Sequence, residues 1–137
     1  MNRSDFQQLA DIRFREARSL LDAGFPDGAY YIAGYAVESA LKACIAKRTQ
    51  QYDFPDKKLV NESHTHNLIE LMRISELAPL LKIAMQADAV LEDQWTTVQS
   101  WSETGRYQRY ETWQAQSLIE AIANPSGGLL PWIRQHW

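Results

Sequence analysis

Cysteine is nearly absent from this sequence: Cys44 is the single one among 137 residues, so the chain has no disulfide framework. Long apolar runs are also lacking, and none approaches the roughly 18 residues that a membrane-spanning helix needs. The first residues include Arg3 and Asp5 in place of the apolar core of an export signal. We therefore expect a cytoplasmic protein in a reducing environment that does not enter a membrane.

This sequence has less positive charge than proteins that coat nucleic acid. Fourteen Lys and Arg residues against seventeen Asp and Glu residues leave a formal net charge of −3. Nonspecific binding to nucleic acid depends on many basic side chains that neutralise phosphates. A nucleic-acid site in this chain must therefore be a local patch.

Motifs for cofactors and metals are missing as well. Gly127 and Gly128 have neither the spacing of a phosphate-binding loop nor the Lys that follows in such a loop. His64 and His66 are two residues apart, and no Cys or third His is near them in the sequence. The sequence thus predicts no cofactor and no metal site.

The chain does contain enough apolar material for one folded domain. Hydrophobic residues make up 45% of it, and there are five Trp, six Tyr and four Phe residues. The alternation typical of β-strands is absent, and apolar residues recur at the spacing of helices. We predict an all-α protein, an up-and-down bundle of four to five helices that forms a single domain over residues 1–137.

The clearest helical pattern covers residues 27–47. Its apolar positions are 29, 32, 33, 36, 37, 40, 41, 44 and 45, which predicts a central helix with one buried face that includes Cys44. Before it we expect a first helix that begins at Ser4, with Gln7 in a capping box, and stops at Gly24, followed by a tight turn over 24–28. After it we expect a surface loop over 49–63 and a short helix that is capped by Ser63 or Thr65 and turns Leu68, Leu71 and Met72 inward. The remaining expected elements are a helix from about 80 to 100, a loop over 101–112, a helix around 118–122 and a last helical turn over 129–137.

A second face of the central helix is polar and aromatic. It carries Tyr31, Tyr35, Glu38 and Lys42, and Glu38 precedes Lys42 by four residues, the order that favours an ion pair. A carboxylate this close to an apolar stripe needs partners. We expect Lys42, Arg106 or His66 to hold Glu38 in one polar cluster.

A basic and aromatic cluster occupies residues 101–113, where two Arg, two Tyr and two Trp residues fall within thirteen positions. Guanidinium groups bind phosphate, and aromatic faces stack on unpaired bases, so this mixture suits single-stranded RNA or a nucleotide. An alternative interpretation is structural: the aromatic residues cap the end of the bundle, and the arginines pair with Glu103, Glu111 or Glu38.

Three segments, in this order along the chain, resemble the signatures of the prokaryotic HEPN (higher eukaryotes and prokaryotes nucleotide-binding) family. They are Ala33-Gly34-Tyr35-Ala36-Val37-Glu38 with Leu41-Lys42-Ala43, then Thr65-His66-Asn67-Leu68, then Trp101-Ser102 with Arg106-Tyr107. The resemblance spans residues 4–137 and implies a homodimeric helical bundle, often encoded beside a nucleotidyltransferase-like partner. It also implies a link to metal-independent ribonucleases of toxin–antitoxin or antiphage systems.

The ribonucleases of this superfamily carry an Arg, four to six further residues and then a His. Counted from Arg106, the positions for that His hold Glu111, Thr112 and Trp113, and counted from Arg109 they hold Gln114, Ala115 and Gln116. The motif is therefore absent, and the usual acid–base arrangement is not assembled from it.

We consequently expect a binding protein for a nucleotide, RNA or a nucleotidyltransferase-like partner protein, in a toxin–antitoxin or defence-type module. The alternatives are a noncanonical ribonuclease that uses His66 with Arg106 and Arg109 across a dimer cleft, and a regulatory partner without nucleic-acid contact. The many aromatic residues and the second face of the central helix favour a homodimer. The residues expected at the binding site or dimer cleft are Glu38, Lys42, His66, Trp101, Arg106, Tyr107, Arg109 and Tyr110.

Overall fold

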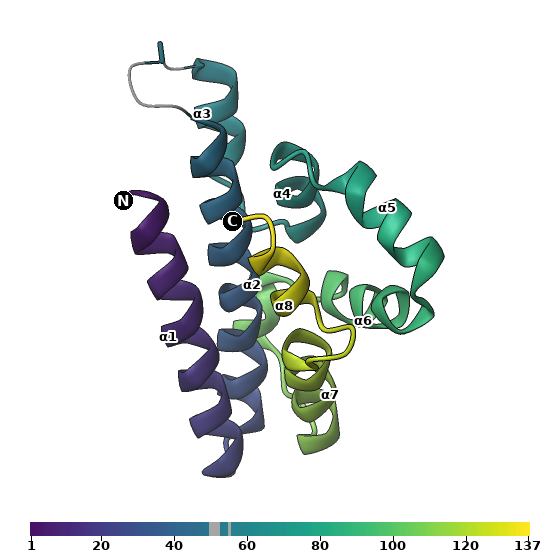
Figure 1. Cartoon of the computed structure of the whole chain (residues 1–137). Helices are drawn as coiled ribbons and strands as arrows, with labels where there is room; N and C mark the ends of the chain where they lie inside the picture. The colour runs from purple at the N-terminus through teal and green to yellow at the C-terminus, as the bar shows by residue number, and fades with distance from the viewer. Residues whose placement is uncertain (50–52, 55) are drawn as a thin grey trace.

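The computed structural model describes residues 1–49, 53–54 and 56–137. Over these residues the chain forms eight α-helices and one short 3-10 helix, and no strand (Figure 1). The predicted all-α fold is confirmed. In the same residues, no helix is long and apolar enough to cross a membrane.

Two long helices, α1 (Arg3–Asp22) and α2 (Pro26–Arg48), lie side by side and antiparallel (Figure 1). The predicted cap of the first helix, Ser4 with Gln7, is wrong by two residues. The side chain of Asn2 accepts the N–H of Asp5, and the Asp5 carboxylate accepts the N–H of Asn2. The same capping chemistry therefore starts α1 two residues earlier.

The turn between the two helices follows the expected pattern. Gly24 has a φ of 85°, a left-handed conformation that glycine adopts without strain. Pro26 then occupies the first turn of α2, where its missing N–H costs no helical hydrogen bond. This short turn makes α1 and α2 a hairpin.

The prediction of a loop over 49–63 is wrong for its second part, because α3 (Lys57–Ser63) forms there. The Asp56 side chain caps α3 by accepting the N–H groups of Lys58 and Leu59. None of the α3 residues is buried, which agrees with the lack of an apolar stripe in this part of the sequence. Residues 50–52 and 55 of the predicted loop lie outside the described residues.

The next helix, α4 (Leu68–Ile74), is capped by Asn67 and not by Ser63 or Thr65. The side-chain oxygen of Asn67 accepts the N–H of Glu70 at 3.0 Å. The Thr65 hydroxyl instead accepts the N–H of Asn67. The residues expected to face inward, Leu68, Leu71 and Met72, are all buried.

The helix predicted from about 80 to 100 is two helices, α5 (Ala78–Ala87) and α6 (Ala89–Gln99). They are separated by Asp88, whose backbone is extended and whose side chain accepts the N–H groups of Val90 and Leu91. A good N-cap residue thus interrupts an apolar pattern that is otherwise continuous. Figure 1 shows α5 on the opposite side of the molecule from α1.

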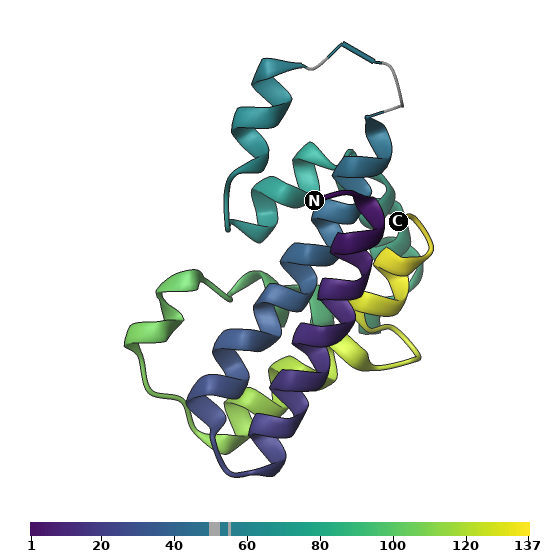
Figure 2. The ribbon, with the colours of Figure 1, turned by 90° about the vertical axis from the view of Figure 1, so that its left-hand side faces the viewer.

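The chain then forms the 3-10 helix η1 (Glu103–Tyr107), α7 (Thr112–Ala123) and α8 (Leu129–Arg134). The centre of the fold is α2, because α1, α4, α7, α8 and η1 all contact it and 12 of its 23 residues are buried. Cys44 is among these buried residues, as predicted. In Figure 2, α3 and η1 lie to the same side of α2, with α3 at its C-terminal end and η1 further towards its N-terminus.

Candidate functional site

The carboxylate of Glu38 lies near the middle of α2 and is almost completely buried, with 7% of its side chain exposed. The Lys42 ammonium lies 2.9 Å from its Oε1 atom. The Nδ1 atom of His66 lies 3.1 and 3.0 Å from the two carboxylate oxygens. The predicted polar cluster is therefore confirmed for Lys42 and His66. Arg106 makes no ion pair with Glu38 within the part of the chain that the structure describes.

This arrangement orients the ring of His66. A carboxylate can only accept hydrogen bonds, so this contact requires the form of the ring that carries a proton on Nδ1. The other ring nitrogen, Nε2, makes no contact with Glu38. The His66 side chain is 49% exposed, whereas the Lys42 side chain is 18% exposed. Two hydrogen-bonded partners, at least one of them charged, offset the cost of burying the Glu38 carboxylate.

Two tyrosines continue the same face of α2 towards its N-terminus. The ring of Tyr35 meets His66 edge to face, with 5.8 Å between the ring centroids. The hydroxyl oxygens of Tyr35 and Tyr31 are 3.2 Å apart. Burial, and next the hydrogen bond with Tyr31, raise the pKa of the Tyr35 hydroxyl, so it stays neutral. We call Tyr31, Tyr35, Glu38 and Lys42, together with His66, the α2 polar strip.

Trp101 lies deeper than expected for a residue that contacts a ligand. It is 4% exposed, and its indole N–H donates to the backbone carbonyl of Tyr31 at 3.2 Å. A Cβ atom at Gly34 would lie 2.0 Å from the indole ring, so the ring packs directly on the backbone of α2. Trp101 therefore anchors the segment that leads into η1 and offers no open face for a base.

Arg106 and Tyr107, at the end of η1, are both exposed, and Tyr107 is 78% exposed. The guanidinium carbon of Arg106 lies 4.8 Å from the centroid of the Tyr107 ring. The neighbouring phenol of Tyr107, and to a smaller degree that of Tyr31, raise the pKa of Arg106, which stays charged. This places Arg106 beside the N-terminal end of the α2 polar strip.

Arg109 and Tyr110 lie apart from this strip, at the start of α2. The Nε of Arg109 lies 2.9 Å from one carboxylate oxygen of Asp27, and the backbone N–H of Tyr110 donates to the other oxygen. The Tyr110 ring stacks on Tyr30, with 3.7 Å between the centroids. The sequence-based interpretation that the arginines pair with Glu103, Glu111 or Glu38 is wrong for Arg109. Its carboxylate partner is Asp27.

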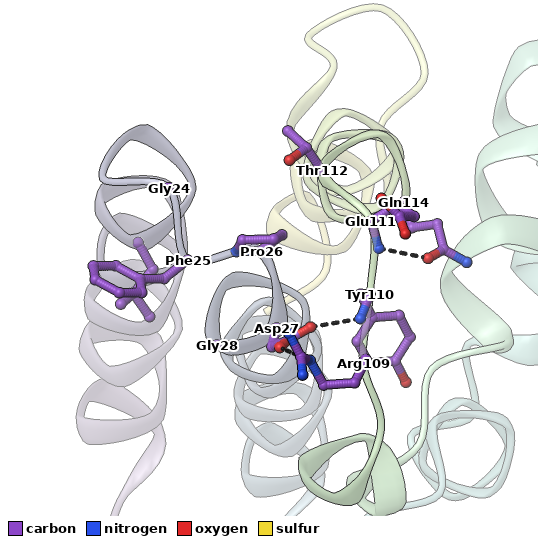
Figure 3. Close-up of a pocket in the computed structure, with 11 residues that line it drawn as sticks. Gly24, Phe25, Pro26, Asp27, Gly28, Arg109, Tyr110, Glu111, Thr112 and Gln114 are labelled. Atoms are coloured by element: carbon purple, nitrogen blue, oxygen red, sulfur yellow. Dashed lines mark hydrogen bonds and ion pairs between the residues drawn. The ribbon is translucent and has the colours of Figure 1, made fainter.

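These two residues line a groove of about 870 Å³, which we call the end groove. It lies where the α1–α2 turn faces the beginning of α7 (Figure 3). The lining residues are Leu20, Gly24, Phe25, Pro26, Asp27, Gly28, Arg109, Tyr110, Glu111, Thr112 and Gln114. The eight candidates thus divide into the cluster around the buried Glu38 carboxylate (Glu38, Lys42 and His66), the exposed pair Arg106 and Tyr107, the groove pair Arg109 and Tyr110, and the anchor Trp101.

Sequence reasoning left Asp27, Tyr31 and Tyr35 out of the candidate residues. A signal for them was present, because positions 27, 31, 35, 38 and 42 recur every three or four residues on one face of a helix. As for metals, no three His, Cys, Asp or Glu side chains come together as ligands anywhere in residues 1–49, 53–54 and 56–137.

The fold and these contacts define a helical-bundle protein whose central helix carries a polar and aromatic strip. The family model described as HEPN domain matches residues 4–124, which is most of the chain. The protein belongs to the HEPN domain family, and this membership supports a nucleotide- or RNA-related function in general terms. Comparisons with curated proteins and with solved structures found no match.

Proposed function

We propose that the protein is a homodimer that binds single-stranded RNA or a nucleotide, with Arg106 and Tyr107 as its first contacts. The observation that carries this proposal is the pair itself. Arg106 forms no ion pair with a carboxylate among the described residues, and Tyr107 beside it is 78% exposed. A guanidinium without a carboxylate partner binds phosphate, and an exposed aromatic ring stacks on a base.

Contacts with α2 and its polar strip hold Arg106 and Tyr107 in position. Trp101 holds the start of η1 against α2, and the Tyr31 phenol lies next to Arg106. The contacts of η1 with α2 therefore fix Arg106 relative to Glu38 and His66. In our proposal the buried Glu38 cluster has a positioning role and keeps α2 and the start of α4 in place.

A salt titration of a labelled oligoribonucleotide tests the proposal. Two Arg contacts per subunit, Arg106 and Arg109, neutralise about four phosphates in a dimer, which gives a log–log salt slope of about −2.8 for a single strand. We expect Arg106→Gln to reduce that slope to about −1.4. Tyr107→Ala should lower the affinity with little change in slope, because stacking releases no counterions.

Arg15→Gln is the matched control, since Arg15 is an exposed arginine on α1, away from η1. It removes the same charge and should leave the slope close to the wild-type value. Absence of saturable binding at low salt would remove RNA from the proposal.

A ribonuclease is the second candidate, and the contact between His66 and Glu38 favours it. A histidine whose Nδ1 is held by a carboxylate presents Nε2 for proton transfer, as in other acid–base sites. Cleavage of RNA in the presence of a chelator, abolished by His66→Ala, would establish this activity. Binding without cleavage would leave the binding function alone.

A partner protein, such as a nucleotidyltransferase-like protein in a toxin–antitoxin or defence-type module, is the third candidate. The surface of α5 favours it, because Leu81 is the single buried residue of this largely apolar helix. Leu80 and Ile83 are 46% and 65% exposed. Co-expression with the product of a neighbouring gene, followed by size-exclusion chromatography of wild type and Ile83→Asp, tests it.

A further inference from the structure

The end groove has the size of a ligand site and is not explained by the contacts of Arg106. Its volume of about 870 Å³ falls within the roughly 300–1,000 Å³ of typical ligand pockets. It is partly open to solvent, and its lining comes from the α1–α2 turn and the first residues of α7 (Figure 3). It therefore suits an extended ligand that crosses the end of the bundle.

The hydrogen-bonding groups of the groove are unevenly used. Both oxygens of Asp27 already accept hydrogen bonds, from Arg109 and from the N–H of Tyr110. The side-chain oxygen of Gln114 accepts the N–H of Glu111 at 2.8 Å. Many of the acceptors in the groove are thus occupied by the protein itself.

The donors of the groove are largely unused. Arg109 donates through Nε alone, and its side chain is 94% exposed. Within the described residues, no hydrogen bond engages its two Nη atoms, the Thr112 hydroxyl or the side-chain nitrogen of Gln114. A groove with free donors and occupied acceptors favours a ligand that supplies acceptors, such as phosphate and carbonyl oxygens.

An aromatic side chain lies at the other end of the groove. Phe25 is 61% exposed on the α1–α2 turn. Figure 3 shows Phe25 on one side of Pro26, and Asp27 with Arg109 on the other side. A ligand that reaches both Phe25 and Arg109 must therefore extend past Pro26, which a chain of nucleotides can do.

We propose that the end groove binds a further stretch of the same single-stranded RNA that Arg106 and Tyr107 contact. This inference rests on the proposed function and adds to it the path that the RNA strand follows beyond Tyr107. Residues 106–107 and 109–110 belong to one short segment, so a strand that leaves Tyr107 reaches Arg109 next. The free edge of Arg109 binds a phosphate, and a following base stacks on Phe25. Glu111 at the rim opposes the strand, because it carries a like charge.

The test is binding of oligoribonucleotides of two lengths, about 4 and about 12 nucleotides, to the full chain. Phe25→Ala should leave the affinity for the short oligomer unchanged and lower that for the long one about tenfold, the loss expected for one stacked base. Trp113→Ala is the matched control, since Trp113 is 66% exposed and does not line the groove. Glu111→Gln should tighten binding of the long oligomer and leave the short one unaffected.

The outcomes separate this inference from the proposed function. Equal losses in Phe25→Ala and Trp113→Ala would overturn the groove path, and so would a loss in Phe25→Ala that is the same for both lengths. If Phe25→Ala and Glu111→Gln bind both lengths like wild type while Arg106→Gln binds them weakly, the groove inference fails and the proposed function stands. If wild type binds neither length, both fail. Because Phe25 is exposed on a turn, its removal should not unfold the protein.

Discussion

The Nδ1 atom of His66 lies 3.0 Å from a carboxylate oxygen of Glu38, and this contact joins the segment before α4 to the middle of α2. The two residues are 28 positions apart in the sequence. The pair, completed by Lys42, is a hydrogen-bonded network around the buried Glu38 carboxylate. Removal of Glu38 leaves Lys42 and His66 without their common partner.

Glu38→Ala should therefore lower the free energy of unfolding by about 2 kcal/mol, as measured by urea denaturation. Glu38→Gln keeps the shape and one acceptor oxygen, so we expect a smaller loss. Glu16→Ala is the control, because Glu16 forms an ion pair with Arg13 at 2.7 Å while its side chain is 44% exposed. Exposed pairs of this kind contribute about 0–1 kcal/mol. Equal stability of Glu38→Ala and wild type would show that the cluster contributes little.

Gly34→Ala tests the anchoring of Trp101. Alanine in place of glycine inside a helix is normally stabilising by about 1 kcal/mol. At Gly34 the added Cβ would meet the indole of Trp101 at 2.0 Å, so we expect destabilisation by roughly 1–3 kcal/mol instead.

Gly28→Ala in the same helix is its matched control. The new Cβ there would lie 3.4 Å from a flexible Leu20 methyl group, so this variant should be neutral or slightly stabilising. A Gly34→Ala variant that gains as much stability as Gly28→Ala would contradict the packing of Trp101 on α2.

Cys44 should make stability depend on alkaline pH. Burial raises the pKa of the Cys44 thiol from its ordinary 9.0 to about 11. Between pH 9 and 11 the unfolded chain loses this proton and the folded chain keeps it, so the free energy of unfolding falls as pH rises. At pH 8 the effect is small, because the thiol is largely protonated in both the folded and the unfolded chain.

The measurement is the stability difference between wild type and Cys44→Ala at pH 8 and near pH 11. We expect the free energy of unfolding of wild type to fall by up to about 2 kcal/mol relative to that of the variant over this range. The contributions of the other titrating groups are the same in both proteins and cancel in the difference. In the folded protein at pH 8, Cys44 should also react slowly with a thiol reagent. Reaction at the rate of a free cysteine would contradict its burial.

Homodimerisation remains a prediction. It was based partly on the number of aromatic residues, but Trp95 and Trp101 are buried, Trp132 and Trp137 are half-buried, and Trp113 alone is largely exposed. The features that favour a dimer are the α2 polar strip and exposed apolar side chains such as Leu80 and Ile83. Light scattering at micromolar concentration should give about twice the 15.8 kDa mass of the chain. A mass that stays at the single-chain value would argue against the dimer.

Some features of this protein could be predicted from the sequence because they depend on neighbours along the chain. The apolar spacing of residues 27–47 predicted α2 and the burial of Cys44, since one helical face must leave water. The ion pair of Glu38 with Lys42 was predictable for the same reason, because positions four apart meet on a helix. Errors arose where several residues offer the same capping group, as with Asn2 and Ser4, or where a cap such as Asp88 interrupts an apolar pattern.

Only the tertiary structure could decide what the basic and aromatic segment does. Arg109 pairs with Asp27, 82 positions away, and Trp101 donates to Tyr31, 70 positions away. In the sequence, Trp101, Arg106 and Arg109 belong to one cluster. In the fold, they are respectively a buried anchor, an exposed cation and part of a groove. Helical periodicity is a local property of the chain, whereas these roles depend on which distant backbone or side chain each residue meets.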